Sequence, residues 1–298
     1  MVFLFTAVTS PFVVLFGPFN NVKRAVIGAI LQSRHPQYIT WLFSNDELQS
    51  ILGTVGVVKS QDLFKFNARE DKDLKLEKIE SSRYVGYVLE IPDPRRIQVA
   101  TAANIQEKGD TTSNIAKMNG AVAAINGGGF HDPNGTGTGR LPYGFILHEG
   151  DYIIGKDVGP DESVDFVGFS KSGNLIAGNY DKTELADMKA MEGITFGPPL
   201  IVDGKKLITD GDGGWGVGPR TAIGQRKDGT VLFVVIDGRQ PGYSLGATLR
   251  DVQDVLYEKG AYIAANLDGG SSSTLYLNGK VVNKPADLLG ERMIPTAF

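Results

Sequence analysis

Three apolar runs along the chain end in the same way. "AVAAIN" ends at Asn126, "VLFVVID" at Asp237 and "YIAANLD" at Asp268, and a glycine follows each of these polar residues directly. Strands this continuously apolar are predicted to be central in a sheet and covered on both faces. A polar side chain at the end of such a strand lies where α/β sheets usually build their sites. Asn-Gly and Asp-Gly are also favoured hairpin dipeptides, but three occurrences together favour one shared site.

The rest of the chain beyond about residue 81 alternates strand-like pieces with a few helices. "RYVGYVLEIPDPRRIQVATA" alternates as two strands joined by a turn at "PDP". "TLRDVQDVLYEKG" is the clearest helix, because Thr248 and Asp251 resemble a capping box and Gly260 follows its last turn. The pattern predicts a mixed α/β (α+β) fold, a strand-rich single catalytic domain with central apolar strands and a few interleaved helices.

The N-terminal pattern differs from that of the domain. Residues 1–22 carry no charge, and their apolar length approaches what a bilayer span requires. They are interpreted as a hydrophobic segment, either a membrane anchor that is truncated in the chain as given or an element packed on the domain. Residues 23–80, with "NDELQSIL" as a short helix capped by Asn45 or Asp46, are predicted to be a helical and charged stalk or accessory region. Residues 81–298 form the predicted catalytic domain.

Composition removes several classes of function. The chain has no cysteine, which excludes thiol catalysis, disulfides and cysteine-based zinc sites. The net charge of −4 argues against nucleic acid as a partner. Only three histidines are present, without metal-ligand spacing, and no metal site is predicted. The glycine-rich acidic stretches "DPNGTGTG" and "DGDGGWGVG" do not match a regular calcium loop, so no cofactor is required and calcium stays an unsupported alternative.

Several stretches, in order along the domain, resemble the phosphodiester glycosidase family. They are "AAINGGGF", "ITFGPPLIVDGK", "GPRTAIGQRKDG", "VVIDGRQPGYSLGATLRDV", "AANLDGGSSSTLYLNG" and "NKPADLLGERMIPTAF". Known members include N-acetylglucosamine-1-phosphodiester α-N-acetylglucosaminidases, and bacterial relatives are described as exopolysaccharide-biosynthesis-like. The resemblance implies a hydrolase that cleaves a sugar-1-phosphodiester, releasing the sugar and leaving phosphate on its carrier.

Carboxylates in these stretches are the candidate catalytic groups. Glycosyl transfer to water passes through an oxocarbenium-like state, which a carboxylate can stabilise, attack, or serve by activating water. Asp268 is the first candidate, followed by Asp237 and Glu291. Because a phosphodiester is a better leaving group than an alcohol, arginine can neutralise the departing charge without a strong general acid. The sequence leaves retaining and inverting routes open.

Candidate phosphate and sugar contacts surround these carboxylates. Guanidinium groups bind phosphate oxygens in a planar, bidentate manner, glycines let backbone N–H groups approach an anion, and serine hydroxyls donate to oxygens. The predicted binding residues are Asn126, Gly127, Gly128, Arg220, Arg239, Gly269, Gly270, Ser271, Ser272 and Arg292. For Arg292, a structural pairing with Glu291 or another carboxylate is an equal alternative.

Two other classes of function remain open. A non-catalytic glycan- or cell-wall-binding module would stack sugars on Tyr143, Trp215 and Tyr243. A phosphodiesterase that cleaves the P–O bond would need several metal ligands, which three histidines disfavour. The apolar N-terminus further suggests an extracytoplasmic protein, membrane-anchored at a bacterial cell surface, whose substrate is a phosphorylated glycan or cell-surface polymer such as a cell-wall component.

Overall fold

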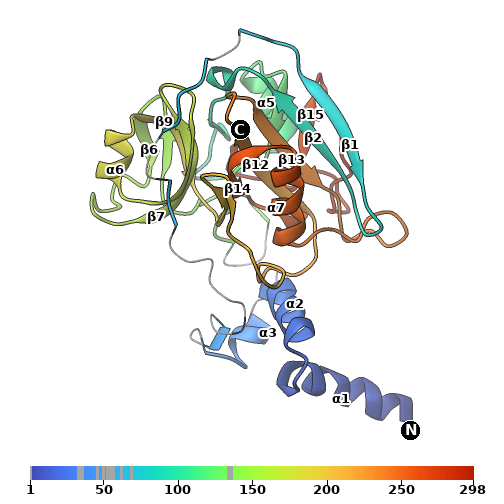
Figure 1. Cartoon of the computed structure of the whole chain (residues 1–298). Helices are drawn as coiled ribbons and strands as arrows, with labels where there is room; N and C mark the ends of the chain where they lie inside the picture. Colours follow the sequence, from blue (N-terminus) through green and yellow to red (C-terminus); the bar gives the residue numbers. More distant parts are fainter. Residues whose placement is uncertain are drawn as a thin grey trace.

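The computed structural model describes residues 2–31, 37–44, 47–48, 51, 58–60, 63–67, 70–132 and 137–298. Most of this chain forms one strand-rich body, and the N-terminal helices project from it (Figure 1). The predicted helix cap at Asn45 or Asp46 lies outside the described residues.

A seven-stranded sheet in the order β1-β2-β13-β12-β14-β10-β11 forms the centre of the body, and every neighbouring pair is antiparallel. Its strands are β1 (Lys75–Glu80), β2 (Val85–Ile91), β13 (Val231–Ile236), β12 (Arg220–Arg226), β14 (Ala261–Asn266), β10 (Pro199–Val202) and β11 (Lys205–Lys206). Every residue of β13 is buried, as are nearly all of β14. Two of the three apolar runs are therefore central strands, as predicted.

Each face of this sheet is covered. Helix α7 (Leu249–Glu258) packs on one face, burying Leu249, Val252 and Leu256 against the strands. Its predicted capping box is confirmed, since Thr248 and Asp251 bond each other's backbone N–H groups. A five-stranded antiparallel sheet packs on the other face, in the order β6 (Asp151–Ile154), β5 (Ile146–His148), β9 (Ala190–Thr195), β7 (Val164–Ser170) and β8 (Leu175–Tyr180).

Smaller elements close the body. One three-stranded sheet runs β16 (Lys280–Val281), β15 (Leu275–Leu277), β4 (Ala123–Ile125), and β17 (Thr296–Ala297) pairs with β3 (Ala100–Thr101). The short helices are α5 (Thr112–Met118), α6 (Lys182–Asp187), η1 (Pro94–Arg96) and η2 (Gly270–Ser272). The strand-rich α+β prediction is confirmed, with one correction. The third apolar run, β4, is an edge strand of a small sheet, because it pairs with β15 and, through Ile125, bonds the backbone of Phe298.

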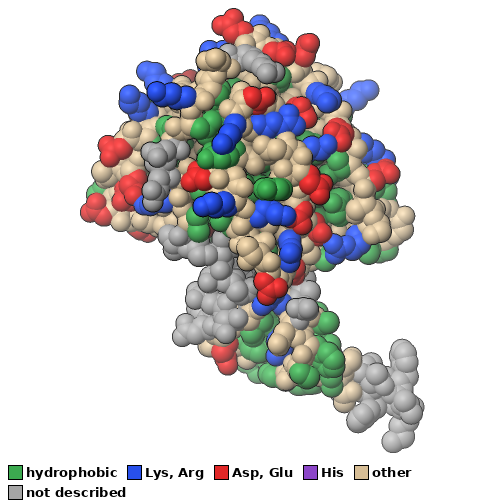
Figure 2. Space-filling model, in the orientation of Figure 1, with side chains coloured by type: hydrophobic (Ala, Val, Ile, Leu, Met, Phe, Trp, Pro, Cys, Tyr) green, Lys and Arg blue, Asp and Glu red, His purple; other side chains and the backbone are tan. Residues whose placement is uncertain are grey.

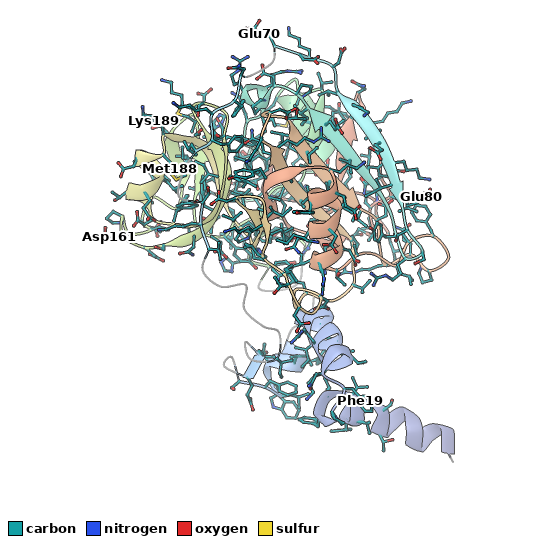
Figure 3. All side chains as sticks on the ribbon, in the orientation of Figure 1. Phe19, Glu70, Glu80, Asp161, Met188 and Lys189 are labelled. Carbon is teal, nitrogen blue, oxygen red and sulfur yellow. The ribbon has the colours of Figure 1, made fainter. Side chains whose placement is uncertain are left out.

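The range 23–80, predicted as a stalk, contributes a strand to the central sheet. β1 pairs with β2 over its whole length, running from the side where Glu70 is labelled to Glu80 (Figure 3). None of its six residues is fully buried, and four of them are charged, as suits an edge strand, so the sequence resembles that of a solvated linker. At "PDP", the short helix η1 replaces the predicted turn, with the Asp93 side chain accepting from the Arg95 backbone N–H.

The N-terminal helices have a small core of their own. Helices α1 (Val2–Phe16), α2 (Asn20–Leu31) and α3 (Gln37–Thr40) bring together Leu15, Ile27, Ile39 and Leu48. Across the part of the chain that the structure describes, no helix combines the length and apolar character needed to cross a membrane.

Candidate active site

Antiparallel pairing brings predicted site residues to one edge of the central sheet. β12 lies between β13 and β14, so these two run in the same direction and end at the same edge. The register pairs Arg220 with Ile236 and Ala222 with Asn266. The sheet edge therefore carries, in spatial order, Asp237 after β13, Arg220 at the start of β12 and the loop that begins at Asp268 after β14.

Asn126 joins the end of β4 to this edge. Its side-chain N–H donates to the Asp268 carbonyl at 2.6 Å, and its Oδ1 accepts from the Thr221 hydroxyl at 2.8 Å and the Thr274 N–H at 3.1 Å. The Gly127 carbonyl accepts from the Asp268 N–H at 3.0 Å. Since Asn126 is fully buried and its amide is used in these bonds, it positions the Asp268 loop; the structure does not offer it to a phosphate.

Asp268 is the carboxylate with the chemistry expected of a catalytic group. Burial raises its pKa to about 6, although the Ser272 hydroxyl, the Arg292 charge, the Gly269 backbone N–H and the Arg239 charge all lower it. A carboxyl with this pKa is mainly ionised at neutral pH and can still gain a proton readily. Two predicted arginines thus lie within electrostatic reach of the first-choice carboxylate.

The turn after Asp268 supplies close backbone and buried hydroxyls. A Cβ on Gly270 would lie 3.3 Å from both terminal nitrogens of Arg239, and the residue has φ +61. A side chain there would meet both steric and conformational resistance. The Ser273 hydroxyl is buried and has no hydrogen-bond partner among the described residues, whereas the buried Ser272 hydroxyl interacts with the Asp268 carboxylate. A buried polar atom such as the Ser273 hydroxyl favours a ligand that satisfies it.

Arg292 reaches the site from the C-terminal segment. One terminal nitrogen donates to Asp132 Oδ2 at 3.2 Å, and the guanidinium lies 4.7 Å from the Phe130 ring centroid. Its Nε is buried without a hydrogen-bond partner in the described part of the protein. The alternative pairing with a carboxylate is therefore present, with Asp132 rather than Glu291, and it leaves part of the guanidinium for a ligand.

Most of the Arg220 side chain is used in hydrogen bonds to backbone carbonyls of neighbouring loops. Its Nε donates to the Ala247 carbonyl at 3.0 Å, and one terminal nitrogen donates to the carbonyls of Trp215 and Gly216 at 2.8 and 2.6 Å. Burial, with the nearby Arg239 charge, lowers its pKa to about 10, so it stays charged. The other terminal nitrogen lies 3.6 Å from the Cβ position of Gly269. Arg220 thus holds two loops at the edge and presents one end towards the Asp268 turn.

Asp237 is tied to its surroundings through both oxygens. Oδ1 accepts from the Asn283 side chain at 2.9 Å and the Lys284 N–H at 3.0 Å, and Oδ2 accepts from the Tyr243 hydroxyl at 3.0 Å. Burial raises its pKa despite these donors. The geometry suits a residue that links two loops beside Arg239 better than one that reacts with substrate.

Glu291 is likewise engaged elsewhere. Its carboxylate accepts from the N–H of Ser113 at 2.9 Å and from the Ser113 hydroxyl, at the start of α5. The arrangement satisfies a helix N–H group and places negative charge at a helix N-terminus. The structure therefore does not bring this carboxylate to Asp268 as a second reacting group.

Glu291→Ala is expected to lower the free energy of unfolding by about 1–2 kcal/mol while largely preserving turnover per folded molecule. Thermal unfolding and product release, measured on the same sample, check this. Glu291→Gln is the matched control, since its amide oxygen can still accept from Ser113. A Glu291→Ala protein that stays as stable as wild type but loses turnover would restore Glu291 as a catalytic candidate.

Aromatic rings next to the Asp268 turn include one that sequence reasoning missed. Burial raises the pKa of Tyr143, and the negative charge of Asp268 adds to this, which places the phenol near the carboxylate. A Cβ on Gly129 would come within 2.6 Å of the Phe196 ring and 2.7 Å of Tyr143. Phe196 meets Trp215 edge-on at 6.1 Å. Phe196 is the residue that sequence reasoning missed. It lies in the "ITFGPP" stretch, and an aromatic residue directly before Gly-Pro was the sequence feature that could have indicated a role in the site.

The described residues contain no cluster of side chains suited to binding a metal ion. No group of three or more histidine, cysteine, aspartate or glutamate side chains there is arranged to hold an ion. The site's charge comes instead from Asp268, Arg239 and Arg292.

The site thus combines a carboxylate within electrostatic reach of two arginines with a glycine- and serine-rich turn and nearby aromatic rings, an arrangement suited to binding an anion. Residues 119–298 match the model of the family described as phosphodiester glycosidase. The chain belongs to the phosphodiester glycosidase family.

Relatives and solved structures agree with this assignment. The chain is 31% identical over 194 residues to the SPbeta prophage-derived protein YomE of Bacillus subtilis, covering 63% of this chain and 29% of that protein. It is 25% identical over 203 residues to N-acetylglucosamine-1-phosphodiester α-N-acetylglucosaminidase of Bos taurus, covering 61% and 36%. The chain thus spans about a third of the length of these relatives.

The fold is similar to that of solved structures. The zebrafish N-acetylglucosamine-1-phosphodiester α-N-acetylglucosaminidase catalytic domain, auto-inhibited by its pro-peptide, aligns with a TM-score of 0.63 at 21% identity, covering 81% of this chain and 87% of that one. A hypothetical protein from Synechocystis aligns with a TM-score of 0.56 at 17% identity, covering 75% and 61%. At these identities the likeness is one of fold.

Proposed function

We propose that this protein hydrolyses a sugar-1-phosphodiester, releasing the free sugar and leaving the phosphate on its carrier. The observation that carries the proposal is Asp268, whose pKa of about 6 results from burial opposed by Arg292 and Arg239. Family membership supports the same reaction. N-acetylglucosamine is the proposed sugar, because the bovine and mouse relatives are named for that substrate.

The arginines would bind and stabilise the phosphate. Arg239 lies beside the Gly270 backbone, and the buried Nε of Arg292 has no hydrogen-bond partner among the residues that the structure describes. As the C1–O bond breaks, negative charge grows on the departing phosphate oxygen, where guanidinium donors stabilise it most. The Ser272 and Ser273 hydroxyls would bond sugar or phosphate oxygens.

Asp268 would act as an ionised carboxylate towards the sugar. It stabilises the positive charge that develops at C1, or takes a proton from the water that adds there. Overall, the water oxygen bonds to C1, one water proton ends on solvent or the carboxylate, and the phosphate monoester leaves. Tyr143 and Phe196 would provide an apolar wall for the sugar ring.

The substrate's setting is proposed from chemistry and location. A phosphorylated glycan or polymer outside the cytoplasm, at a cell surface, would present sugar-1-phosphodiester groups to an enzyme associated with a membrane. A glycan-binding module without catalysis is the competing function, supported by the same aromatic residues, and it would tolerate the loss of Asp268.

Product analysis tests the proposal. The full chain is incubated with an α-N-acetylglucosamine-1-phosphodiester, and products are separated and identified. Free N-acetylglucosamine from wild type, and none from a folded Asp268→Asn variant, is the expected result. N-acetylglucosamine-1-phosphate would show P–O cleavage instead. Bound but uncleaved substrate, from a panel that includes phosphate-bearing cell-surface polymers, would support the binding module.

A further inference from the structure

The N-terminal helices expose an unusual set of aromatic side chains. Trp41 is 84% exposed, Tyr38 65% and Phe12 62%, while Phe16 and Phe19 are exposed by half or slightly more. We refer to these five residues as the N-terminal aromatic surface. The helices bury Leu15, Ile27, Ile39 and Leu48 in their own core, and the five aromatic side chains lie largely exposed outside that core. Figure 2 shows hydrophobic side chains gathered on this projecting part, and Figure 3 labels Phe19 at the junction of α1 and α2.

Ring contacts link α1 to the segment after α3. Phe12 and Phe16 stack with centroids 6.4 Å apart, and Phe16 stacks on Phe43 at 5.5 Å. Phe43 is two residues from Trp41. The exposed rings of α1 and Trp41 thus belong to one helical unit rather than to separate flexible segments.

The charge of this unit points to one kind of partner. Residues 1–48, up to the core residue Leu48, contain three basic residues, Lys23, Arg24 and Arg34, and two acidic ones, Asp46 and Glu47, and no aspartate or glutamate lies before Asp46. Helix α1 carries no charge in any of its 15 residues. Uncharged helices with tryptophan, tyrosine and phenylalanine, flanked by basic residues, are suited to lie in the interface of a bilayer with anionic lipids.

The unit adjoins the site edge of the body. Gly28 of α2 is so close to the backbone of Gly214 and Gly216 that a Cβ there would lie 3.0 Å from the Gly216 nitrogen. The same loop provides the Trp215 and Gly216 carbonyls that accept from Arg220. In Figure 1, α2 meets the body at this loop, below the strands. A surface that holds the helices would therefore lie on the site's side of the domain.

We infer that the N-terminal aromatic surface binds the surface of an anionic lipid bilayer and holds the site edge towards that bilayer. The inference does not depend on the proposed reaction. It requires only that the rings of Tyr38 and Trp41 enter the lipid interface and that Lys23 faces anionic headgroups.

Vesicle binding of the full chain tests this inference. We expect sedimentation with phosphatidylcholine vesicles that contain phosphatidylglycerol, and weaker binding without it or at high salt. The double variant Tyr38→Ser/Trp41→Ser should bind about tenfold more weakly or worse, because it removes the two most exposed rings of the N-terminal aromatic surface. Leu76→Ser, on the edge strand β1 and 40% exposed, is the matched control and should bind like wild type.

Tryptophan fluorescence tests directly whether the Trp41 ring enters the lipid interface. In a Trp215→Phe background, Trp41 is the remaining tryptophan, and its emission should shift to shorter wavelength on adding vesicles. No sedimentation with either vesicle, or unchanged binding by the double variant, would overturn the inference. Concentration-dependent self-association that the double variant abolishes, without vesicle binding, would identify a second copy as the partner instead. No substrate is used, so failure here leaves the proposed reaction untouched.

Discussion

Asp268→Asn is expected to abolish hydrolysis while making the protein more stable above pH 6. Asparagine keeps the shape of the carboxyl group but can neither carry the negative charge nor accept a proton from water. Without a negative carboxylate facing the sugar C1, turnover should fall by about a thousandfold or more. The Asn126 bond to the Asp268 carbonyl is independent of this side chain, so the loop should keep its position.

The stability effect follows from the direction of the pKa change. The Asp268 carboxyl has a pKa of about 6 when folded and an ordinary value of 3.8, so the folded protein holds the proton more tightly than the unfolded chain. Folding is therefore opposed by ionisation as pH rises from about 4, and the full penalty, at most roughly 3 kcal/mol, is present above pH 6. Asparagine removes that penalty, and below about pH 4 the two proteins should be equally stable.

Denaturant unfolding at pH 4 and pH 8, with turnover at pH 8, checks both parts. Asp237→Asn is the matched control: another buried aspartate with a raised pKa, whose oxygens accept three hydrogen bonds. It should lose stability at pH 8, because an amide nitrogen would face a donor. A destabilising effect of Asp268→Asn at pH 8 would contradict the raised pKa, and retained turnover would exclude Asp268 as the reacting carboxylate.

The apolar runs correctly predicted those central strands that are covered on both faces of the sheet. The β13 and β14 sequences are continuously apolar because both faces are covered, and the helix of residues 249–258 follows from its periodicity and capping box. β4 is equally apolar in sequence but lies at an edge of a small sheet. Which sheet a short strand joins depends on long-range pairing with Thr296 and Leu275, which no local pattern contains.

The candidate site was predicted in its composition but not in its division of roles. The sequence ranked Asp268 first among three candidate catalytic carboxylates and kept Asp237 and Glu291 as further candidates. The structure separates them, because Asp237 is held by Tyr243 and Asn283, and Glu291 by Ser113, residues that are distant in sequence or unremarkable in type. The pKa of Asp268 depends on burial and on which arginines fold next to it, which spacing cannot supply.

Arg292→Gln is expected to reduce kcat/KM by about a hundredfold or more and to move the acid limb of its pH profile upward. Removing the guanidinium takes away a hydrogen-bond donor that we propose binds the phosphate. It also removes a positive charge that would stabilise the negative charge growing on the departing phosphate. Arg292 also lowers the pKa of Asp268, so without it that pKa rises above about 6. In the free enzyme the ionised, active form then appears only at higher pH.

Arg292→Lys separates these two effects. Lysine keeps the charge near Asp268 but lacks the planar fork, so kcat/KM should fall while the acid limb stays near pH 6. The profile of kcat/KM against pH, measured for both variants and wild type on one sugar-1-phosphodiester, reads out the difference. A structural role for Arg292, through Asp132 and Phe130, would lower stability in both variants and leave the limb unmoved in both. An upward shift in the glutamine variant alone would therefore identify Arg292 as the charge that keeps Asp268 ionised at neutral pH.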